Sequence, residues 1–191
     1  MNTPPFYGMV SNHEIKFLGN VTLRNPLDAW MVQQIMWDTK PDFLIETGTF
    51  RGGSAIYYGS IFDLMGSGKV ISIDSKPEST PDHPRVEYML GNSINDDILR
   101  QVKEQIGGRS CMVILDSDHS YDHVKRELEV YSPLVTVGNY LIIEDGNPCE
   151  TVVTACDEFV AAHPEFERRD DWDKAFYEIS FNYRGWLRRI R

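Results

Sequence analysis

Residues 45–55 read IETGTFRGGSA, the end of an apolar run that passes through a glycine-rich loop into a helical pattern. From residue 43 onward, short apolar runs rich in β-branched residues alternate with longer stretches of helical spacing. This alternation is typical of βαβ units with a parallel sheet, whose strands are covered on both faces. The predicted strands are 43–47, 69–74, 86–90, 111–116 and 140–145. The sequence therefore predicts an α/β fold.

The gaps between the strands predict the helices. Helical spacing of apolar residues places them at 53–65, 94–106, 120–131 and 151–163. Residues 75–85 hold three prolines, too many for a long helix. The aromatic, period-two stretches 166–170 and 175–183 predict an antiparallel pair of strands added at one edge of the sheet.

The first forty residues form a lead-in to this alternating region. Asn25 followed by Pro26 is typical of a helix start. The residues that we expect on the core-facing side of that helix are Leu27, Trp30, Met31, Gln34 and Ile35. No linker or repeat divides the chain, so we expect one domain in which a lead-in, 1–40, precedes the main α/β part, 41–191.

Composition limits the partners. The chain has 191 residues, with 19 Lys and Arg against 29 Asp and Glu, and a formal net charge of −10. A nucleic-acid partner is therefore not expected. The basic residues that cluster do so at the C-terminal end, as Arg184, Arg188, Arg189 and Arg191. They are interpreted as a solvated chain end or as a contact for an anion or another subunit. In the last case the protein would form a homo-oligomer.

The cysteines and the N-terminal residues bear on location. Cys111, Cys149 and Cys156 form no CxxC pair, which predicts neither a zinc ribbon nor a secreted disulfide scaffold. The first residues show no basic stretch followed by an apolar one, and no run approaches the ~18 apolar residues of a membrane span. We expect a cytoplasmic protein with no membrane insertion.

The glycine-rich loop indicates a ligand that meets backbone. It differs from a dinucleotide fingerprint because Phe50 stands where the second glycine of that motif is needed, and no lysine follows as in a phosphate-binding loop. Glu46, at the head of the loop, suits a ligand with a cationic group such as an amino acid's ammonium. Asp74 closes the next strand, where a carboxylate can accept hydrogen bonds from ribose hydroxyls. A capping or turn carboxylate is the alternative.

A second group of polar residues follows two further strands. Asp116, Glu144 and Asp145 are three carboxylates that neighbouring strands can bring onto one Mg²⁺, Mn²⁺ or Ca²⁺, although solvated loop acids have the same pattern. His119 lies three residues after Asp116, and its titration range suits a general base. His123, four residues further on, can share a metal with His119, but the glutamate of an H-E-x-x-H motif is missing.

Taken in order, these segments resemble the class I S-adenosylmethionine (SAM)-dependent methyltransferases. Within that class they are similar to the cephalosporin-hydroxylase-like group, which includes rhamnosyl and macrolide-sugar O-methyltransferases. The matching segments are 45–55, VISID at 70–74, LDSDHS at 115–120, the pattern EL-x-x-Y at 127–131, GNYLIIEDG at 138–146 and NYRGWLR at 182–188. The resemblance covers about residues 19 to 191.

The resemblance implies a Rossmann-like class I methyltransferase fold over 41–191, with a mostly parallel seven-stranded sheet, an antiparallel C-terminal edge hairpin and helices on both faces. It implies that SAM binds with its methionine end at Glu46 and Gly48, its ribose at Asp74 and its adenine near Asn92 and Ser93. The full set of implied cofactor-binding residues is Glu46, Thr47, Gly48, Thr49, Gly53, Ser54, Asp74, Ser75, Asn92, Ser93, Asp116 and His119.

The same resemblance implies a function. His119 would be the general base and Asp116 a second catalytic residue, with Asp116, Glu144 and Asp145 holding Mg²⁺ or Mn²⁺. The expected enzyme is a metal-dependent O-methyltransferase that acts on a hydroxyl of a sugar, either a saccharide or a glycosylated natural product. The alternatives are a non-haem iron hydroxylase using His119, His123 and Asp116, an NAD-dependent oxidoreductase, and an inactive SAM-binding protein.

Overall fold

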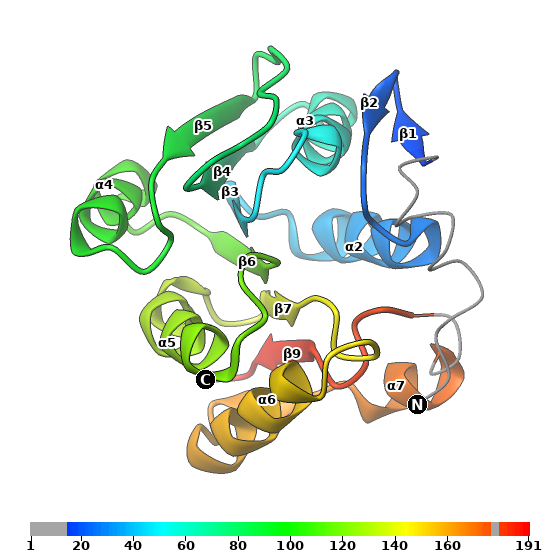
Figure 1. Ribbon diagram of the computed structural model, residues 1–191, viewed down its shortest axis with the longest axis vertical. Coiled ribbons are helices and arrows are strands. Elements are labelled where there is room, and N and C mark those ends of the chain that lie inside the picture. The colour runs from blue at the N-terminus through cyan, green and yellow to red at the C-terminus, as the bar shows by residue number, and fades with distance from the viewer. Residues whose placement is uncertain (1–14, 177–179) are drawn as a thin grey trace.

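The computed structural model describes residues 15–176 and 180–191, and its centre is a seven-stranded sheet (Figure 1). The strands are β3 (Phe43–Thr47), β4 (Lys69–Asp74), β5 (Val86–Leu90), β6 (Cys111–Leu115), β7 (Tyr140–Ile143), β8 (Phe166–Arg168) and β9 (Trp186–Arg189). Their spatial order is β5-β4-β3-β6-β7-β9-β8. All five predicted strands are present, which confirms the α/β prediction, but β5 is an edge strand with Leu90 74% exposed, so it is not covered on both faces as expected.

The order of the strands fixes where a ligand can bind. β3 pairs in parallel with both β4 and β6, so that Ile45 lies opposite Ile71 on one side and Val113 on the other. The chain runs outward from β3 to β5 and then returns to β6 on the other side. Ligands of open α/β sheets bind beyond the carboxyl ends of the strands at such a reversal.

Helices cover both faces of the sheet (Figure 1). They are α2 (Pro26–Thr39), α3 (Gly53–Met65), α4 (Asp96–Ile106), α5 (Tyr121–Tyr131), α6 (Glu150–Ala162) and α7 (Asp170–Phe176), with a short 3₁₀ helix at Ser132–Leu134. The predicted cap of α2 is confirmed, since the Asn25 side chain accepts a hydrogen bond from the Leu27 amide at 2.9 Å. Each other predicted helix begins and ends within two residues of its expected bounds.

Alternate residues of the strands pack into two separate cores. Ile45 and Val113 point to the side covered by α4, α5 and α6. Leu44 and Met112 point to the side covered by α2 and α3. Because both sides of each central strand are buried, the strands read as continuous apolar runs in the sequence.

The C-terminal pair of strands differs from the prediction in one partner. β8 lies within the expected stretch 166–170, but its antiparallel partner is β9 at Trp186–Arg189 rather than 175–183. In the predicted stretch, α7 extends through residue 176, residues 177–179 lie outside the described part of the chain, and residues 180–183 form no strand. The aromatic residues in this stretch suggested a strand. In the structure, Phe181 is buried in a loop, and its backbone amide donates a hydrogen bond to the Asp28 carboxylate at 2.7 Å.

Two further features near the N-terminus depart from the sequence analysis. Trp30, expected to face the core, is 65% exposed, and Gln34 is also exposed, whereas Met31 and Ile35 are buried as expected. A small hairpin of β1 (Lys16–Phe17) and β2 (Asn20–Val21) was not predicted. It packs so closely on the start of α3 that a Cβ at Gly53 would lie 2.2 Å from the Val21 carbonyl oxygen. In the described residues, no helix has both the length and the apolar character to cross a membrane.

Candidate active site

A cavity of about 590 Å³ opens beyond the carboxyl ends of the central strands, at the reversal of strand order. This volume lies within the ~300–1,000 Å³ typical of small-molecule sites. Twelve residues that the sequence analysis selected line it, namely Gly48, Thr49, Gly53, Ser54, Asp74, Ser75, Asn92, Ser93, Asp116, His119, Glu144 and Asp145. The strand topology therefore brings nearly all of the selected residues together. Glu46 and Thr47 are not among the lining residues and are fully buried.

Gly48 allows the glycine-rich loop after β3 to lie directly against Asp116, which follows β6. Its φ is +88°, a conformation that side chains rarely adopt, and its amide donates to the Ile73 carbonyl at 2.8 Å. A Cβ at this position would lie 1.9 Å from the Asp116 carbonyl oxygen. Only glycine fits between the loop and Asp116 without moving backbone.

We expect Gly48→Ala to displace the Asp116 backbone, abolish binding of S-adenosylhomocysteine (SAH) and lower thermal stability. Calorimetric titration and thermal unfolding measure the two effects. Gly66→Ala is the matched control, because Gly66 has a similar φ of +81° but no atom within 4 Å of its added Cβ. If the two variants bind SAH equally well, the close approach at Gly48 does not shape the ligand site.

Asp74 is held by backbone amides at the edge of the cavity. Its two carboxylate oxygens accept hydrogen bonds from the Phe50 amide at 2.9 Å and the Lys76 amide at 2.8 Å. Phe50 itself has a φ of +50°, so the position that holds glycine in dinucleotide-binding loops here takes the left-handed conformation with a side chain. Each carboxylate oxygen retains a lone pair for a ligand hydroxyl.

Glu46 meets a cation, but that cation belongs to the protein. Its carboxylate is completely buried, where Oε1 lies 2.9 Å from Nη2 of Arg24 and Oε2 accepts a hydrogen bond from Ser72 at 2.7 Å. Burial raises the pKa of Glu46, although Arg24, Ser54 and Ser72 act in the opposite direction. The expected contact between Glu46 and a ligand ammonium stays a prediction. In the structure, the cation beside this carboxylate is Arg24.

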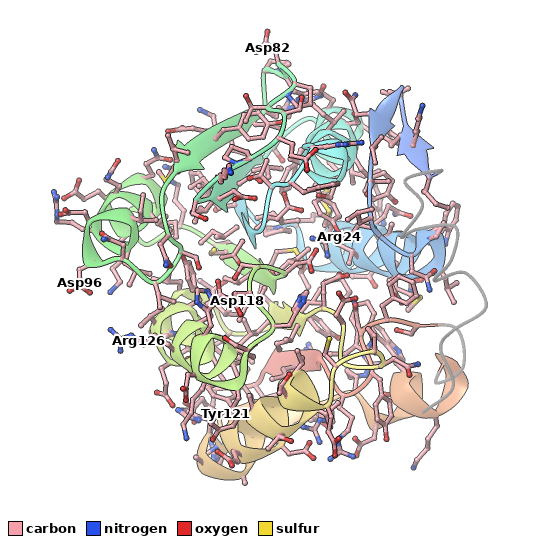
Figure 2. All side chains as sticks on the ribbon, viewed as in Figure 1. Arg24, Asp82, Asp96, Asp118, Tyr121 and Arg126 are labelled. Carbon is pink, nitrogen blue, oxygen red and sulfur yellow. The ribbon has the colours of Figure 1, made fainter. Side chains whose placement is uncertain are left out.

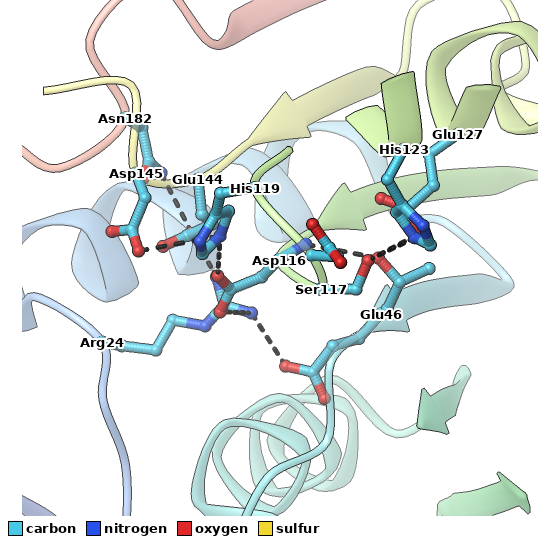
Figure 3. Close-up of polar contacts among 12 residues, drawn as sticks. Arg24, Glu46, Asp116, Ser117, His119, His123, Glu127, Glu144, Asp145 and Asn182 are labelled. Atoms are coloured by element: carbon cyan, nitrogen blue, oxygen red, sulfur yellow. Dashed lines mark hydrogen bonds and ion pairs between the residues drawn. The ribbon is translucent and has the colours of Figure 1, made fainter. Parts of the chain in front are cut away.

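Asp116, His119 and Asp145 form a compact group of two carboxylates and an imidazole, the candidate metal-binding group of this cavity. Each offers one ligand atom, and these atoms lie within 4.8 Å of one another. His119 Nε2 is 3.4 Å from Asp116 Oδ1 and 3.7 Å from Asp145 Oδ2. Figure 3 shows the imidazole between the two carboxylates. Oxygen-rich sites of this kind suit Mg²⁺, Mn²⁺ or Ca²⁺.

Glu144, the third predicted metal ligand, has different partners. It lines the cavity, but its Oε1 forms an ion pair with Nη1 of Arg24 and accepts a hydrogen bond from Asn182 at 3.1 Å. It is not part of the compact group of Asp116, His119 and Asp145. Its role as a metal ligand stays a prediction.

Burial and nearby charges shift the pKa values of three groups at this end of the cavity, Glu144, Asp145 and His119. Burial and the neighbouring carboxylates raise the pKa of both Glu144 and Asp145. Burial alone would lower the pKa of His119, but its contact with Asp116 and the charges of Asp145 and Glu144 raise it to about 9. Shifted pKa values of this kind are typical of sites that carry out chemistry. Like charges held close together are costly unless a ligand compensates them, so their crowding here favours a ligand site.

His123 serves a different part of the cavity from His119. Its Nε2 lies 3.1 Å from Ser117 Oγ and 3.2 Å from Ser93 Oγ. The same nitrogen is 3.5 Å from Glu127, which also accepts a hydrogen bond from Ser117 at 2.8 Å. His123 is absent from the metal-binding group, so the structure does not bring the two histidines onto one ion.

Arg24 is the main residue of the site that sequence reasoning missed. It lines the cavity from the segment between β2 and α2, and it contacts acids that follow or end three different strands. Its only sequence signal is its place before the Asn25 cap of a helix, which says nothing about a partner. Asn182, whose side-chain amide donates to Glu144, was also missed, because nothing in its sequence position indicates this partner.

The profile of the Rhamnosyl O-methyltransferase/CmcI family matches residues 10–190. The chain belongs to this family. Curated relatives named Rhamnosyl O-methyltransferase include one from Mycobacterium tuberculosis (strain H37Rv), 31% identical over 150 residues, which cover 74% of this chain and 61% of the relative. Another, from Mycobacterium leprae (strain TN), is 32% identical over 149 residues, covering 74% and 65%. The match thus spans less than two thirds of the length of these relatives.

Solved structures agree on the fold. CmcI with Mg and SAM has a TM-score of 0.74 at 19% identity, over 94% of this chain and 78% of that chain. The O-methyltransferase NovP has a TM-score of 0.66 at 20% identity, over 95% and 88%. MycE from the mycinamycin biosynthetic pathway, in complex with Mg, SAH and Mycinamycin VI, has a TM-score of 0.54 at 20% identity, over 75% and 38%. These likenesses confirm the class I methyltransferase fold.

Proposed function

We propose that this protein is a SAM-dependent O-methyltransferase that uses a divalent cation and transfers the methyl group to a hydroxyl of a sugar. The observation that carries the proposal is the position of Asp116. Its backbone lies against Gly48 of the glycine-rich loop, and its side chain belongs to the metal-binding group. One cavity therefore joins a nucleoside-type pocket to a set of oxygen and imidazole ligands. The family to which the chain belongs and the Mg-containing CmcI and MycE structures support the same proposal.

The residues present fit the cofactor. The glycine-rich loop, Asp74 and Asn92 line one continuous cavity with Asp116. Asp74 can accept from ribose hydroxyls with the lone pairs left free by Phe50 and Lys76. SAM supplies a sulfonium methyl group that is open to in-line displacement. The chain's contribution is to hold the acceptor oxygen in line with that methyl group, and orientation of this kind is worth up to roughly 7–11 kcal/mol.

The residues present also fit a divalent cation. Two half-buried carboxylates and an imidazole converge, and burial together with the neighbouring Asp116 carboxylate raises the pKa of Asp145 even though His119 and Arg24 act in the opposite direction. Asp116 and Asp145 would hold the ion, with Glu144 as a further candidate. A bound Mg²⁺ lowers the pKa of a hydroxyl that it contacts. His119, the third member of this group, would accept the proton of the acceptor hydroxyl.

The geometry favours this enzyme over the alternatives. A non-haem iron hydroxylase needs two histidines and one carboxylate on one ion, whereas His123 makes its contacts with Ser93, Ser117 and Glu127. An NAD-dependent oxidoreductase needs space at the second glycine position, which Phe50 fills. An inactive SAM-binding protein would be expected to have lost the base or the acids, and both are in place.

A calorimetric titration with SAH tests the cofactor, with NAD as control. We expect SAH to bind, NAD to give no heat, and Mg²⁺ to bind in a separate titration that EDTA abolishes. Transfer of labelled methyl from SAM to a panel of glycosides, with the matching aglycones as controls, then tests the acceptor class. Absence of SAH binding would overturn the proposal, and methylation of aglycones alone would overturn the sugar acceptor.

A further inference from the structure

Arg24 lies in the interior of the molecule, between the N-terminal hairpin and the sheet. Figure 2 shows it beside α2, whereas Asp82, Asp96 and Arg126 lie at the periphery. Its side chain is 4% exposed, and its guanidinium lies 5.7 Å from the centre of the Tyr58 ring. A buried arginine is costly unless acids surround it, so its partners should explain its position.

Those partners are three carboxylates from separate parts of the sheet. Nη2 lies 2.9 Å from Glu46 and 3.5 Å from Asp116, and Nη1 contacts Glu144 (Figure 3). Asp116 is also a member of the metal-binding group with Asp145. Arg24 therefore shares a carboxylate with the candidate cation site and touches a second acid on its wall.

The charges around Arg24 do not balance. Glu46, Asp116, Glu144 and Asp145 bring four carboxylates to the surroundings of the guanidinium. Against them stand the fixed positive charge of Arg24 and that of the protonated His119 imidazole beside Asp116 and Asp145. A divalent cation would compensate two more. A fixed positive charge a few ångströms from that ion repels it, because buried charges are screened little by solvent.

We propose that Arg24 is a built-in counter-ion of the acid cluster: it keeps the metal-free chain folded around Glu46, Asp116 and Glu144, and it weakens the affinity of the cluster for a divalent cation. The cation half of this inference rests on the proposed function. The folding half depends only on contacts within the chain. Weak binding would allow the ion to exchange with each acceptor, rather than remain as a permanent structural metal.

The folding half is tested by Arg24→Met, which keeps much of the side-chain volume and removes the charge. Loss of one partner from a buried ion-pair network should lower the melting temperature in EDTA by about 6–20 °C. Arg100→Met is the control, because Arg100 pairs with Asp97 on the exposed face of α4 and should change the melting temperature little. An equal shift in the two variants would overturn the counter-ion role.

A double variant separates lost charge compensation from lost packing. Glu144→Gln removes a charge that Arg24→Met leaves without its partner, and it keeps an oxygen for Asn182. It should raise the melting temperature more in the Arg24→Met background than in the wild-type background. Equal shifts in both backgrounds would show that Arg24 acts by packing alone and would overturn the proposal.

The cation half is tested by titration with MgCl₂. We expect Arg24→Met to bind Mg²⁺ at least about tenfold more tightly than wild type and to gain more melting temperature from it. Arg24→Lys keeps the charge and should retain the wild-type affinity. Unchanged or weaker binding by Arg24→Met overturns this half. If neither protein binds Mg²⁺, this half falls with the metal dependence of the proposed function, while SAH binding still tests the cofactor and the double variant still tests the counter-ion.

Discussion

Replacing His119 with alanine is expected to lower the methyl-transfer rate by about 10²–10⁴ while SAH binds with nearly wild-type affinity. The imidazole lies between Asp116 and Asp145, 3.4 Å and 3.7 Å from their oxygens, at the metal-binding end of the cavity. A base at this end acts on the acceptor, so its loss should affect turnover and leave the nucleoside end intact. Steady-state kinetics and SAH calorimetry on the same preparation measure both quantities.

The control for His119 is the second histidine of the cavity. His123→Ala removes a ring in the first turn of α5 whose Nε2 lies 3.2 Å from Ser93 Oγ and 3.1 Å from Ser117 Oγ. We expect this change to weaken SAH binding more than it lowers the rate at saturating SAM. If His119→Ala weakens SAH binding as much as it lowers turnover, His119 is a binding residue and the base lies elsewhere.

The protonation of His119 links the base to the cation. The surrounding acids raise its pKa to about 9, so at neutral pH roughly one imidazole in a hundred lacks its proton in the metal-free chain. The raised pKa comes from Asp116, Asp145 and Glu144, and any positive charge added to that group lowers it. We therefore attribute the expected metal dependence of turnover partly to the base, which is ready to accept a proton only when the charge of the acids is compensated.

The central strands of the sheet could be predicted from sequence because β3, β6 and β7 are buried at every position. The run 111–115 is apolar at every position, and in β3 Leu44 and Ile45 fill the two separate cores. The last strand lacked this signal. β9 contains Trp186 and Leu187 followed by two arginines, so four residues of mixed character were weaker evidence than the aromatic stretch before them.

The site was predicted to the extent that strand topology determines it. Asp74, Asp116 and Asp145 end or follow parallel strands, and the carboxyl ends of such strands meet at one edge. Arg24 could not be found in this way, because its partners lie 22, 92 and 120 positions further along the chain. For Glu46, the contact with a ligand ammonium stays a prediction, and the structure adds a cation of the chain itself, Arg24, which nothing in the sequence indicated beside this carboxylate.

Replacing Asp145 with asparagine is expected to weaken Mg²⁺ binding by at least about 100-fold and to lower turnover with it, since even outer partners of metal ligands contribute 10–100-fold. Asparagine is the substitution of choice because Asp145 has a φ of +61°, which asparagine tolerates better than alanine. The fold should therefore be unchanged, and thermal unfolding in EDTA checks this.

The matched control is Asp118→Asn, a change of the same size and charge in the same cavity. The Asp118 carboxylate accepts from the Ser120 amide at 2.7 Å and is not part of the metal-binding group. It should leave Mg²⁺ affinity within a few-fold of wild type. Glu144→Gln then decides the third ligand: a loss as large as that of Asp145→Asn places Glu144 on the ion, whereas a residue that acts through its charge beside Arg24 and Asn182 should weaken Mg²⁺ binding by about tenfold or less. Equal Mg²⁺ affinity in wild type and Asp145→Asn would show that the cation, if it binds, binds away from this group.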